Sequence, residues 1–485
     1  MKMFNGYERL PRNYSLLSDN YEHKMGQGYL LDGKKDEIAG FDVFFRKVPN
    51  NGGYAIMAGL DKVISYIENL HFGEKELRYF KRAGFRDEYI EYLKNFKFTG
   101  TVKAIPDGTP VFPNEPLITI VAPVIEAQIV ETAVLALVNG AMEHATGARR
   151  VIEATPKGVG VMEFGSRRAD GTEAAIDASL YGMMAGCVGT SNDLAADMVD
   201  KIALGTMAHS DIESYDDELS AFIAFARTYP ENCILLVDTY DTLRSGIPNA
   251  IKTFKWMEEN GIPTDHIGIR IDSGDLAYLS KEARRMFIEA GFPQAKICLS
   301  NGLTAETIET LIAQGAEFDS LGVGDNISKP EGRMGCVYKE VSINGVPKIK
   351  LSEDAIKIVN PAIKDLYRAY DNETGYAVAD IMTREGEEIK NDDLIIVSTT
   401  DYLKRKKLTD FTIVPLQQTI FDKGELVYDD PDLDATKAYC EAQMATIYPE
   451  VKRTVQPHIY HVSGTEEYVN FKNELIEEHR KLVLQ

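Results

Sequence analysis

The feature that most constrains the fold is a regular alternation of short apolar segments and helical patterns between Val159 and Val323. Strands that alternate with helices in this way form parallel βα units, and seven of them favour a barrel over an open sheet. One strand fewer than eight and a very short unit around Val188 predict that the barrel is irregular. The seven predicted strands are Val159–Phe164, Cys187–Thr190, a segment starting near Lys201 and leading into Leu204–Ser210, Ile234–Val237, Ile267–Ile271, Lys296–Leu299 and Phe318–Val323.

The chain has 485 residues, which is too long for a single hydrophobic core, so more than one domain is expected. Residues 1–150 mix a predicted strand at Ile38–Arg46 with helical patterns and end in a linker helix at Glu126–Ala154. This mixture predicts an α+β domain. Residues 151–338 form the predicted barrel, and residues 339–485 form a smaller mixed segment that begins with a hairpin at Asn344–Gly345. The predicted fold class is α/β.

The composition excludes several classes of protein. A net charge of −22 argues against a nucleic-acid surface, although it is compatible with a local basic pocket for a small anion. The five cysteines are widely separated and include no C-x-x-C pair, so neither a zinc site nor a disulfide framework is expected. No apolar run approaches the length of a membrane span, and the first residues lack an apolar signal-peptide core. We therefore expect a cytoplasmic protein without membrane contact.

Polar and glycine residues follow nearly every predicted strand of the barrel. In a βα barrel these strand ends share one face, where active sites form. Ordinary turns and helix caps explain Asp241, Asp275 and Thr304, but seven such clusters together exceed what turns require. We therefore predict one ligand site, built from Glu163–Arg168, Gly189–Asn192, Thr206–Ser210, Asp238–Asp241, Arg270–Asp275, Ser300–Gly302 and Gly322–Asn326.

The residue types at these strand ends indicate the kind of ligand. Arg167 and Arg270 can each make a forked contact with a carboxylate or a phosphate. Glycines in the last two loops allow the backbone to approach a phosphate closely. Asp238 and Asp272 suit ribose hydroxyls, Mg²⁺ or the far nitrogen of His209, whose imidazole is a nucleophile or base near pH 7. The set predicts a phosphorylated sugar and a second anion as ligands.

Four of these motifs resemble those of the nicotinate phosphoribosyltransferase family. They are Glu163–Arg168, Gly205–Ser210, Arg270–Leu276 and Ser300–Leu303, and the likeness extends from Tyr21 to Val359. The resemblance implies a homodimer with an N-terminal open-faced sandwich domain, an irregular seven-stranded α/β barrel and active sites completed across the subunit interface. It also implies that nicotinate and 5-phosphoribosyl 1-pyrophosphate are joined to give nicotinate mononucleotide and pyrophosphate, with ATP hydrolysis coupled through a phosphorylated histidine.

The resemblance assigns catalytic roles to residues at matching positions. His209 matches the phosphorylated histidine, and Asp238 matches the carboxylate that orients it. Arg167 and Arg270 match arginines near the nicotinate carboxylate and the phosphates. Asp272 matches a group for the ribose or for Mg²⁺, and Asp238 is a second candidate for the metal.

The resemblance also assigns substrate contacts. Phe164 is expected to stack on nicotinate, and Tyr21 of the partner subunit on the other face of the ring. Thr206 is expected to touch a substrate. The remaining expected contacts are Ser166, Ser273 and Asn301, together with Gly302, Gly322 and Gly324 as the cradle of the 5′-phosphate.

One departure and three alternatives remain open. Many relatives carry Thr where this chain has Asp325, whose charge would repel phosphate, so backbone N–H groups or Asn326 are expected there instead. The same fold could act on nicotinamide, or on quinolinate with decarboxylation. The neutral Ser191 favours nicotinate modestly, and quinolinate needs more cations than the motifs supply. A non-catalytic, metabolite-binding barrel is the third alternative.

Overall fold

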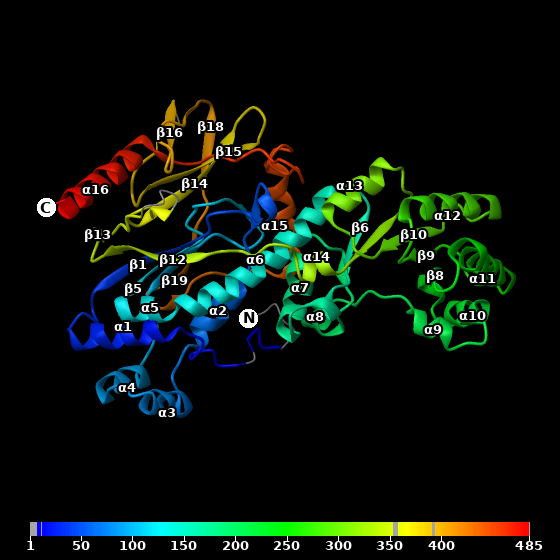
Figure 1. The fold of residues 1–485 in the computed structure, drawn as a ribbon, viewed down its shortest axis with the longest axis horizontal. Coiled ribbons are helices and arrows are strands. Elements are labelled where there is room, and N and C mark those ends of the chain that lie inside the picture. Colours follow the sequence, from blue (N-terminus) through cyan, green and yellow to red (C-terminus); the bar gives the residue numbers. More distant parts are fainter. Residues whose placement is uncertain (1–6, 11, 353–356, 390–392, 485) are drawn as a thin grey trace. The chain divides into compact units, whose positions relative to one another are not determined.

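The computed structural model describes residues 7–10, 12–352, 357–389 and 393–484 (Figure 1). The chain divides into two compact units, one made of residues 1–146 and 332–485 and the other of residues 147–331. The boundary falls within helix α6 (Glu131–Ala154). This division differs from the three predicted segments, because residues from 332 onward group with the N-terminal residues.

The first unit contains a seven-stranded sheet in the order β13-β12-β1-β5-β3-β19-β20. In this sheet β1 (Ile38–Phe44) pairs antiparallel with β12 (Val337–Ile343), while β3 (Thr101–Ala104) pairs antiparallel with β19 (Gln418–Asp422). Strands from the C-terminal segment therefore complete the N-terminal sheet. The other strands are β5 (Ile118–Pro123), β13 (Val346–Pro347) and β20 (Glu425–Leu426), and a separate pair joins β2 (Ala55–Ile56) to β4 (Pro110–Val111).

Helices of the first unit pack on this sheet. Helix α5 (Val124–Ile129) contacts β1 and β5, and α1 (Asn20–Leu31) packs on α5. The other N-terminal helices are α2 (Leu60–Asn69), α3 (Glu74–Arg82) and α4 (Asp87–Lys94), with a short 3-10 helix at Pro49–Asn51. The expected α+β character of this part is thus present.

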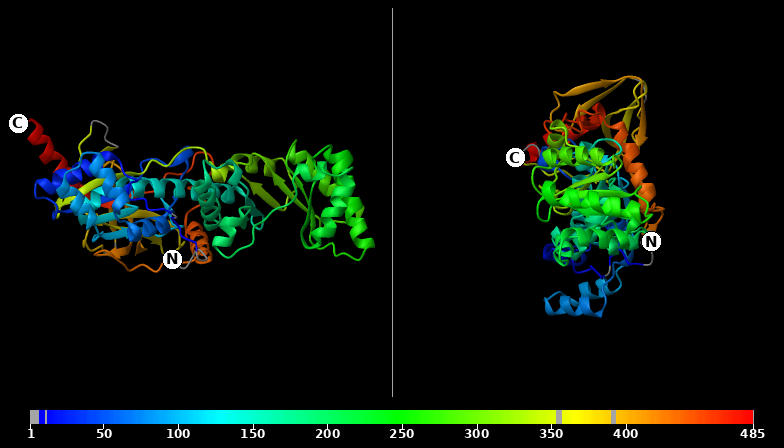
Figure 2. Two further views of the ribbon diagram at one scale, coloured as in Figure 1. Left: turned by 90° about the horizontal axis from the view of Figure 1, so that it is seen from below. Right: turned by 90° about the vertical axis from the view of Figure 1, so that its right-hand side faces the viewer.

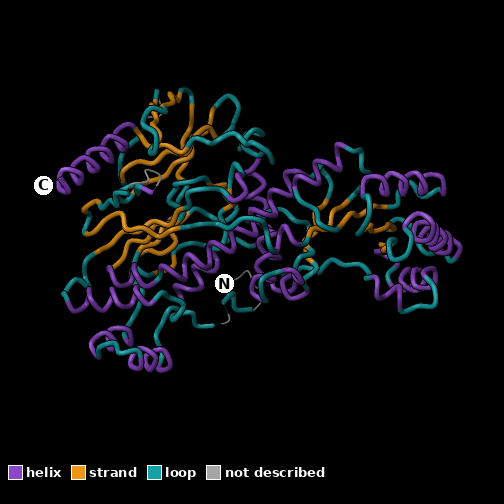
Figure 3. The backbone as a smooth tube through the Cα atoms, in the orientation of Figure 1, coloured by secondary structure: helices purple, strands orange, loops and turns teal. Residues whose placement is uncertain are grey.

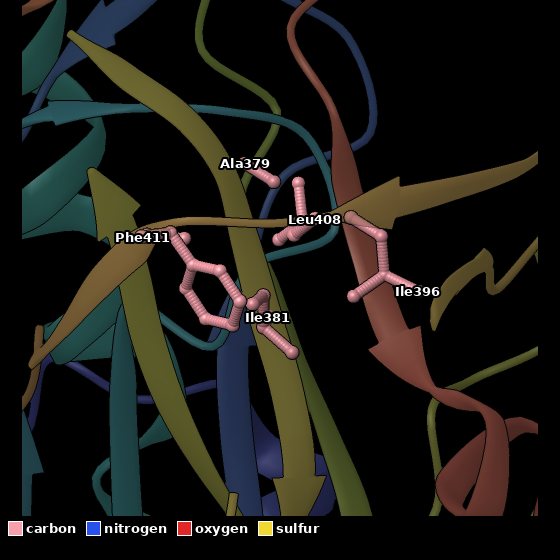
Figure 4. Close-up of a cluster of buried hydrophobic side chains, with 6 residues drawn as sticks. Ala379, Ile381, Ile396, Leu408 and Phe411 are labelled. Carbon is pink, nitrogen blue, oxygen red and sulfur yellow. The ribbon is translucent and has the colours of Figure 1, made fainter. Parts of the chain in front are cut away.

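A second sheet of the first unit has the order β17-β16-β21-β15-β14-β18. Side chains from five of its strands form a buried apolar cluster that includes Ile381, Ile396, Leu408 and Phe411 (Figure 4). Its elements are β14 (Lys364–Asp371), β15 (Ala377–Arg384), β16 (Leu394–Ser398), β17 (Arg405–Leu408), β18 (Phe411–Pro415), β21 (Val462–Thr465), α15 (Leu433–Thr446) and α16 (Glu466–Leu484). Helix α16 covers β15, β16 and β21.

The second unit is a curled sheet of parallel strands in the order β7-β6-β11-β10-β9-β8, with helices between them (Figure 3). Helix α11 packs against both α10 and α12 (Figure 2). The strands are β6 (Gly160–Glu163), β7 (Gly189–Thr190), β8 (Cys233–Leu236), β9 (Ile267–Ile271), β10 (Lys296–Ser300) and β11 (Ser320–Val323). The helices include α7 (Thr172–Met184), α8 (Asp193–Met198), α10 (Glu218–Thr228), α11 (Ile247–Glu259), α12 (Leu276–Ala290) and α13 (Ala305–Ala313). The predicted α/β class is confirmed.

The third predicted strand is not formed. Residues 201–208 adopt neither helix nor strand, and a backbone hydrogen bond from Leu204 N to Thr190 O of 2.7 Å joins them to the sheet. The neighbouring strand β7 has only two residues, so it offers too few backbone groups for a further strand to pair along it. In the unpaired segment, Ile202 is 90% exposed. Six strands therefore form the sheet of residues 147–331, instead of seven, and it stays open between β7 and β8.

The cysteines are small buried groups in both units. All five are buried and outside any disulfide, and burial raises the pKa of Cys233 and of Cys336 to about 12. At neutral pH these thiols are therefore protonated packing groups. Among the residues that the structure describes, no helix has both the length and the apolar character that a membrane span requires.

Candidate active site

Two carboxylates lie at the carboxyl ends of neighbouring strands β8 and β9. The Oδ2 atom of Asp238 accepts hydrogen bonds from the backbone N of Asp272 (3.0 Å) and from Ser273 Oγ (2.6 Å). Asp272 in turn accepts a hydrogen bond from Ser300 Oγ at the end of β10. The structure thus joins three strand ends that the sequence had assigned to one site.

The Oδ1 atom of Asp238 is buried and has no hydrogen-bond partner in the described part of the chain. A buried carboxylate oxygen without a partner is costly, so it marks a place for a donor or a cation. Within the described residues no group of three or more His, Cys, Asp or Glu side chains gathers as a metal site. Mg²⁺ usually takes one or two carboxylates and completes its shell with water and substrate phosphates. Asp238 and Asp272 therefore fit Mg²⁺ that arrives with a phosphorylated substrate.

Arg270 connects strand β9 to the loop before His209. Its Nη2 donates to the carbonyl oxygen of Met207 at 3.0 Å, while its buried Nε has no acceptor among the described residues. The guanidinium is consequently anchored at one end and keeps a buried donor for a ligand. That arrangement suits the anionic ligand predicted from the sequence.

His209 is the first residue of α9 (His209–Glu213), so it starts a helix instead of ending a strand. Its Nδ1 lies 3.1 Å from Thr239 Oγ1. The predicted contact with Asp238 is not formed in the described residues, because that carboxylate is turned to the backbone of Asp272 and to Ser273. Thr239, the next residue along the chain, takes the place expected for Asp238.

Phe164 follows β6 and is held by a hydrogen bond from its backbone N to Val323 O of 2.8 Å. Its ring lies over Gly322, where an added Cβ would stand 2.6 Å from Phe164 Cδ2. Gly322 is therefore needed to make room for the ring. An added Cβ at Gly302 meets no atom within 4 Å, and both Asn301 and Gly302 have positive φ angles of 85° and 60° in an exposed turn. An added Cβ at Gly324 would contact Phe164 O at 3.4 Å.

Glu163 supports the loop that carries Phe164, and sequence reasoning missed this role. It is fully buried, with Oε1 accepting from Gly165 N and Oε2 accepting from Ser179 Oγ (2.9 Å) and Thr190 Oγ1 (2.6 Å). The sequence feature that could have indicated this role is a carboxylate at the end of an apolar strand. Three donors at one buried carboxylate fix the start of the loop.

The rest of this loop carries the other predicted contacts. Ser166 Oγ accepts from Asn192 Nδ2 at 3.1 Å, which links the loops after β6 and β7. Arg167 is exposed in a short 3-10 helix, Ser166–Arg168. Its neighbour Arg168 pairs with Asp325 across 3.6 Å, and both side chains are exposed. The charge of Asp325, which departed from the expected pattern, is thereby matched by an arginine.

Thr206 lines a cavity of about 530 Å³ formed by its loop and by α9 and α10. Its hydroxyl donates to Met207 O at 3.3 Å, and the cavity wall also includes Asp211, Tyr215 and Tyr229. Cavities of this size hold small organic molecules. Thr206 is thus accessible to a ligand, as its predicted role requires.

Tyr21 does not belong to the group of residues that the second unit brings together. It lies in α1 of the first unit, and its side chain is 44% exposed. Burial of its hydroxyl and, to a smaller extent, the nearby charge of Glu131 raise the pKa of Tyr21 above its usual range. Its expected role in a neighbouring subunit stays a prediction.

Comparison with known proteins adds independent evidence. Residues 16–139 match the profile of the nicotinate phosphoribosyltransferase N-terminal domain, and residues 363–472 match that of the C-terminal domain. A nicotinate phosphoribosyltransferase of Bacillus subtilis is 38% identical, over 96% of this chain and 95% of that protein. One from Dictyostelium discoideum is 34% identical, over 93% of this chain and 86% of its own length.

Solved structures give the same result for the fold. The crystal structure of human nicotinic acid phosphoribosyltransferase superposes with a TM-score of 0.82 at 25% identity, covering 95% of this chain and all (100%) of the human chain. A nicotinate-nucleotide pyrophosphorylase from Pyrococcus furiosus gives 0.70 at 22% identity, over 90% of this chain and 96% of its own. This second likeness concerns the fold alone.

Proposed function

The chain belongs to the nicotinate phosphoribosyltransferase family, and we propose that it makes nicotinate mononucleotide and pyrophosphate from nicotinate and 5-phosphoribosyl 1-pyrophosphate. This reaction contributes to NAD biosynthesis. The observation that carries the proposal is that two adjacent strands bring Arg270, whose buried Nε has no acceptor among the described residues, and Asp238, whose buried Oδ1 has no donor there, to the same edge of the sheet. A substrate with both anionic and hydroxyl groups satisfies both atoms.

The reaction breaks the bond between ribose C1 and the pyrophosphate oxygen, and the pyridine nitrogen forms the new bond to C1. Positive charge develops on the ribose while negative charge leaves with pyrophosphate. Arg270 stabilises that negative charge, and Asp238 and Asp272 hold the ribose hydroxyls. The ring of Phe164, fixed over Gly322, provides a flat surface on which nicotinate stacks. Asp238 and Asp272 are also the residues that would hold Mg²⁺, which when bound would neutralise charge on pyrophosphate.

ATP is the proposed third substrate. The γ-phosphoryl group moves from ATP to Nε2 of His209, ADP leaves, and water later releases phosphate. Nδ1 faces Thr239, which leaves Nε2 for the phosphoryl group. Phosphorylation adds negative charge to the segment in which the Met207 carbonyl accepts a hydrogen bond from Arg270. Through this hydrogen bond, the change at His209 affects the position of Arg270 in the substrate site.

The enzyme is further proposed to be a homodimer whose sites share residues of two subunits. Tyr21 from one subunit then stacks on nicotinate bound in the other. Mixing two inactive variants, Tyr21→Ala and Arg270→Ala, restores activity if sites are shared, because mixed dimers contain one intact site. If the mixture is as inactive as each variant alone, although exchange of subunits has been verified, the sites are not shared between subunits.

Trapping a labelled phosphoryl group tests the ATP coupling. Protein incubated with γ-labelled ATP is expected to carry acid-labile, base-stable phosphate whose turnover depends on nicotinate. His209→Ala is expected to lose this label and the stimulation by ATP while retaining slow transferase activity. His266→Ala, an exposed histidine in the same unit, is the matched control and keeps both. If His209→Ala still hydrolyses ATP in step with product, the histidine assignment is wrong.

A further inference from the structure

A second, smaller cavity lies in the first unit, within the six-stranded sheet and its loops. Its volume is about 210 Å³, and it is bounded by the turn between β16 and β17 and by the segment that leads into β21. Ser398, Thr400 and Ser463 contribute hydroxyl groups, and Lys404, Arg405 and His461 contribute positive or protonatable groups. Lys406 completes the basic lining.

Among the residues that the structure describes, no carboxylate lines this cavity, although acidic residues exceed basic ones by 22 charges in the whole chain. Lys404 pairs with Asp401 at 3.5 Å and Arg405 with Glu466 at 2.7 Å. Both pairs are largely exposed, and exposed ion pairs contribute little, about 0–1 kcal/mol. These two cations are therefore available to an anion.

Lys406 and His461 are the other two protonatable groups of the lining, and the charge of Lys406 disfavours protonation of His461. Lys406 is half-buried, and its Nζ donates to the carbonyl oxygen of Val378 at 3.1 Å. Burial lowers the pKa of Lys406, which Asp371 offsets only in part. Burial, Lys406 and His458 together lower the pKa of His461. A bound anion would relieve this crowding of positive charge.

The turn between β16 and β17 is rigidly built. Ile396 of β16 and Leu408 of β17 are anchored in the buried apolar cluster (Figure 4). Ser398 N donates to Lys404 O at 3.0 Å, and Ser398 Oγ accepts from the backbone N of Asp401 at 3.2 Å. The basic side chains thus project from a backbone that is already ordered, which lowers the entropic cost of binding.

The size of the cavity limits the ligand. Pockets for drug-sized molecules enclose about 300–1,000 Å³, so a cavity of 210 Å³ is too small to bury a nucleotide. A tetrahedral oxyanion or its dimer fits, and its oxygens match the ammonium, guanidinium and hydroxyl donors of the lining. We propose that this cavity binds a small phosphate-class anion, either inorganic phosphate or pyrophosphate, separately from the catalytic residues of the second unit.

NMR of the intact protein with labelled histidine tests this proposal. The His461 resonance is assigned by its absence in His461→Gln, and it is followed at pH 7.5 during titration with phosphate, with pyrophosphate and with chloride at equal ionic strength. Saturable movement with at least one of the two oxyanions, and none with chloride, is expected. Because His461 itself lines the cavity, binding of these anions at the catalytic site does not produce this signal.

Two variants on one strand separate the cavity from general charge effects. Lys406→Gln is expected to weaken binding by about tenfold or more, the loss of one charge-assisted hydrogen bond. Lys407→Gln is the matched control, since Lys407 does not line the cavity and pairs with Asp393 at 2.9 Å. It is expected to bind as the parent protein does, and both variants must unfold as cooperatively as the parent. Equal movement with chloride, no saturation with either oxyanion, or equal losses in the two variants overturns the proposal.

Discussion

Replacing Gly322 by alanine tests the packing that positions Phe164. The new Cβ would stand 2.6 Å from Cδ2 and 2.8 Å from Cε2 of the Phe164 ring. Carbon atoms in contact prefer about 3.5–4.0 Å, so the ring must move by roughly 1 Å. Overpacking of this kind costs about 1–3 kcal/mol in stability. Because a misplacement of about 1 Å at a reacting centre can cost about 10²-fold in rate, kcat/KM for nicotinate is expected to fall by about 10–100-fold.

Steady-state kinetics with nicotinate and denaturant unfolding measure the two effects. Gly322→Ala combined with Phe164→Leu is expected to recover stability, since the smaller side chain removes the clash, but not the affinity for nicotinate. Gly205→Ala is the control for unfolding, because an added Cβ there meets no atom within 4 Å. A Gly322→Ala protein with parental stability and parental KM would refute the role given to this glycine.

Three further changes probe other parts of the structure. Arg368 is fully buried, and its guanidinium donates two hydrogen bonds to Asp380 at 2.8 and 2.6 Å. Arg368→Met is therefore expected to lower the free energy of unfolding, measured in urea, by about 3–5 kcal/mol. A loss below about 1 kcal/mol would contradict the stabilising role given to this buried ion pair. Burial lowers the pKa of His23 to about 4, so the folded state resists protonation, and about 3 kcal/mol of stability is lost as pH falls from 6.5 towards 4. The His23→Gln variant is expected to lack this loss. If the free energy of unfolding depends on pH equally in the variant and in the parent protein, the prediction is wrong. Arg270→Lys loses the forked donor and is expected to lower kcat/KM by about 10–100-fold, with unfolding unchanged; unchanged kinetics would remove Arg270 from the site.

Local sequence patterns predicted most of the second unit. Strands such as β9 (Ile267–Ile271) are short apolar runs bounded by turn residues, and the structure places them where the pattern did. The strand expected from Lys201 failed for a non-local reason, because its neighbour β7 offers only two residues for pairing. The joining of β12 and β19 to the N-terminal sheet likewise depends on partners hundreds of residues away, which no local pattern encodes.

The same distinction applies to the site. Strand ends identified Asp238, Asp272 and Arg270 as neighbours, because parallel strands bring their carboxyl ends to one edge. The partner of His209 depends on side-chain orientation, so Thr239 was found only in the structure. Glu163 was overlooked because its donors come from three separate segments.

The most direct measurement is product formation by the purified protein. Nicotinate, 5-phosphoribosyl 1-pyrophosphate, ATP and Mg²⁺ are supplied, and nucleotides are separated and quantified. Nicotinate mononucleotide and pyrophosphate are expected in equal amounts, with more product in the presence of ATP than without it, and with far slower turnover of nicotinamide or quinolinate. No nicotinate mononucleotide, or equal rates with nicotinamide, would contradict the proposed function.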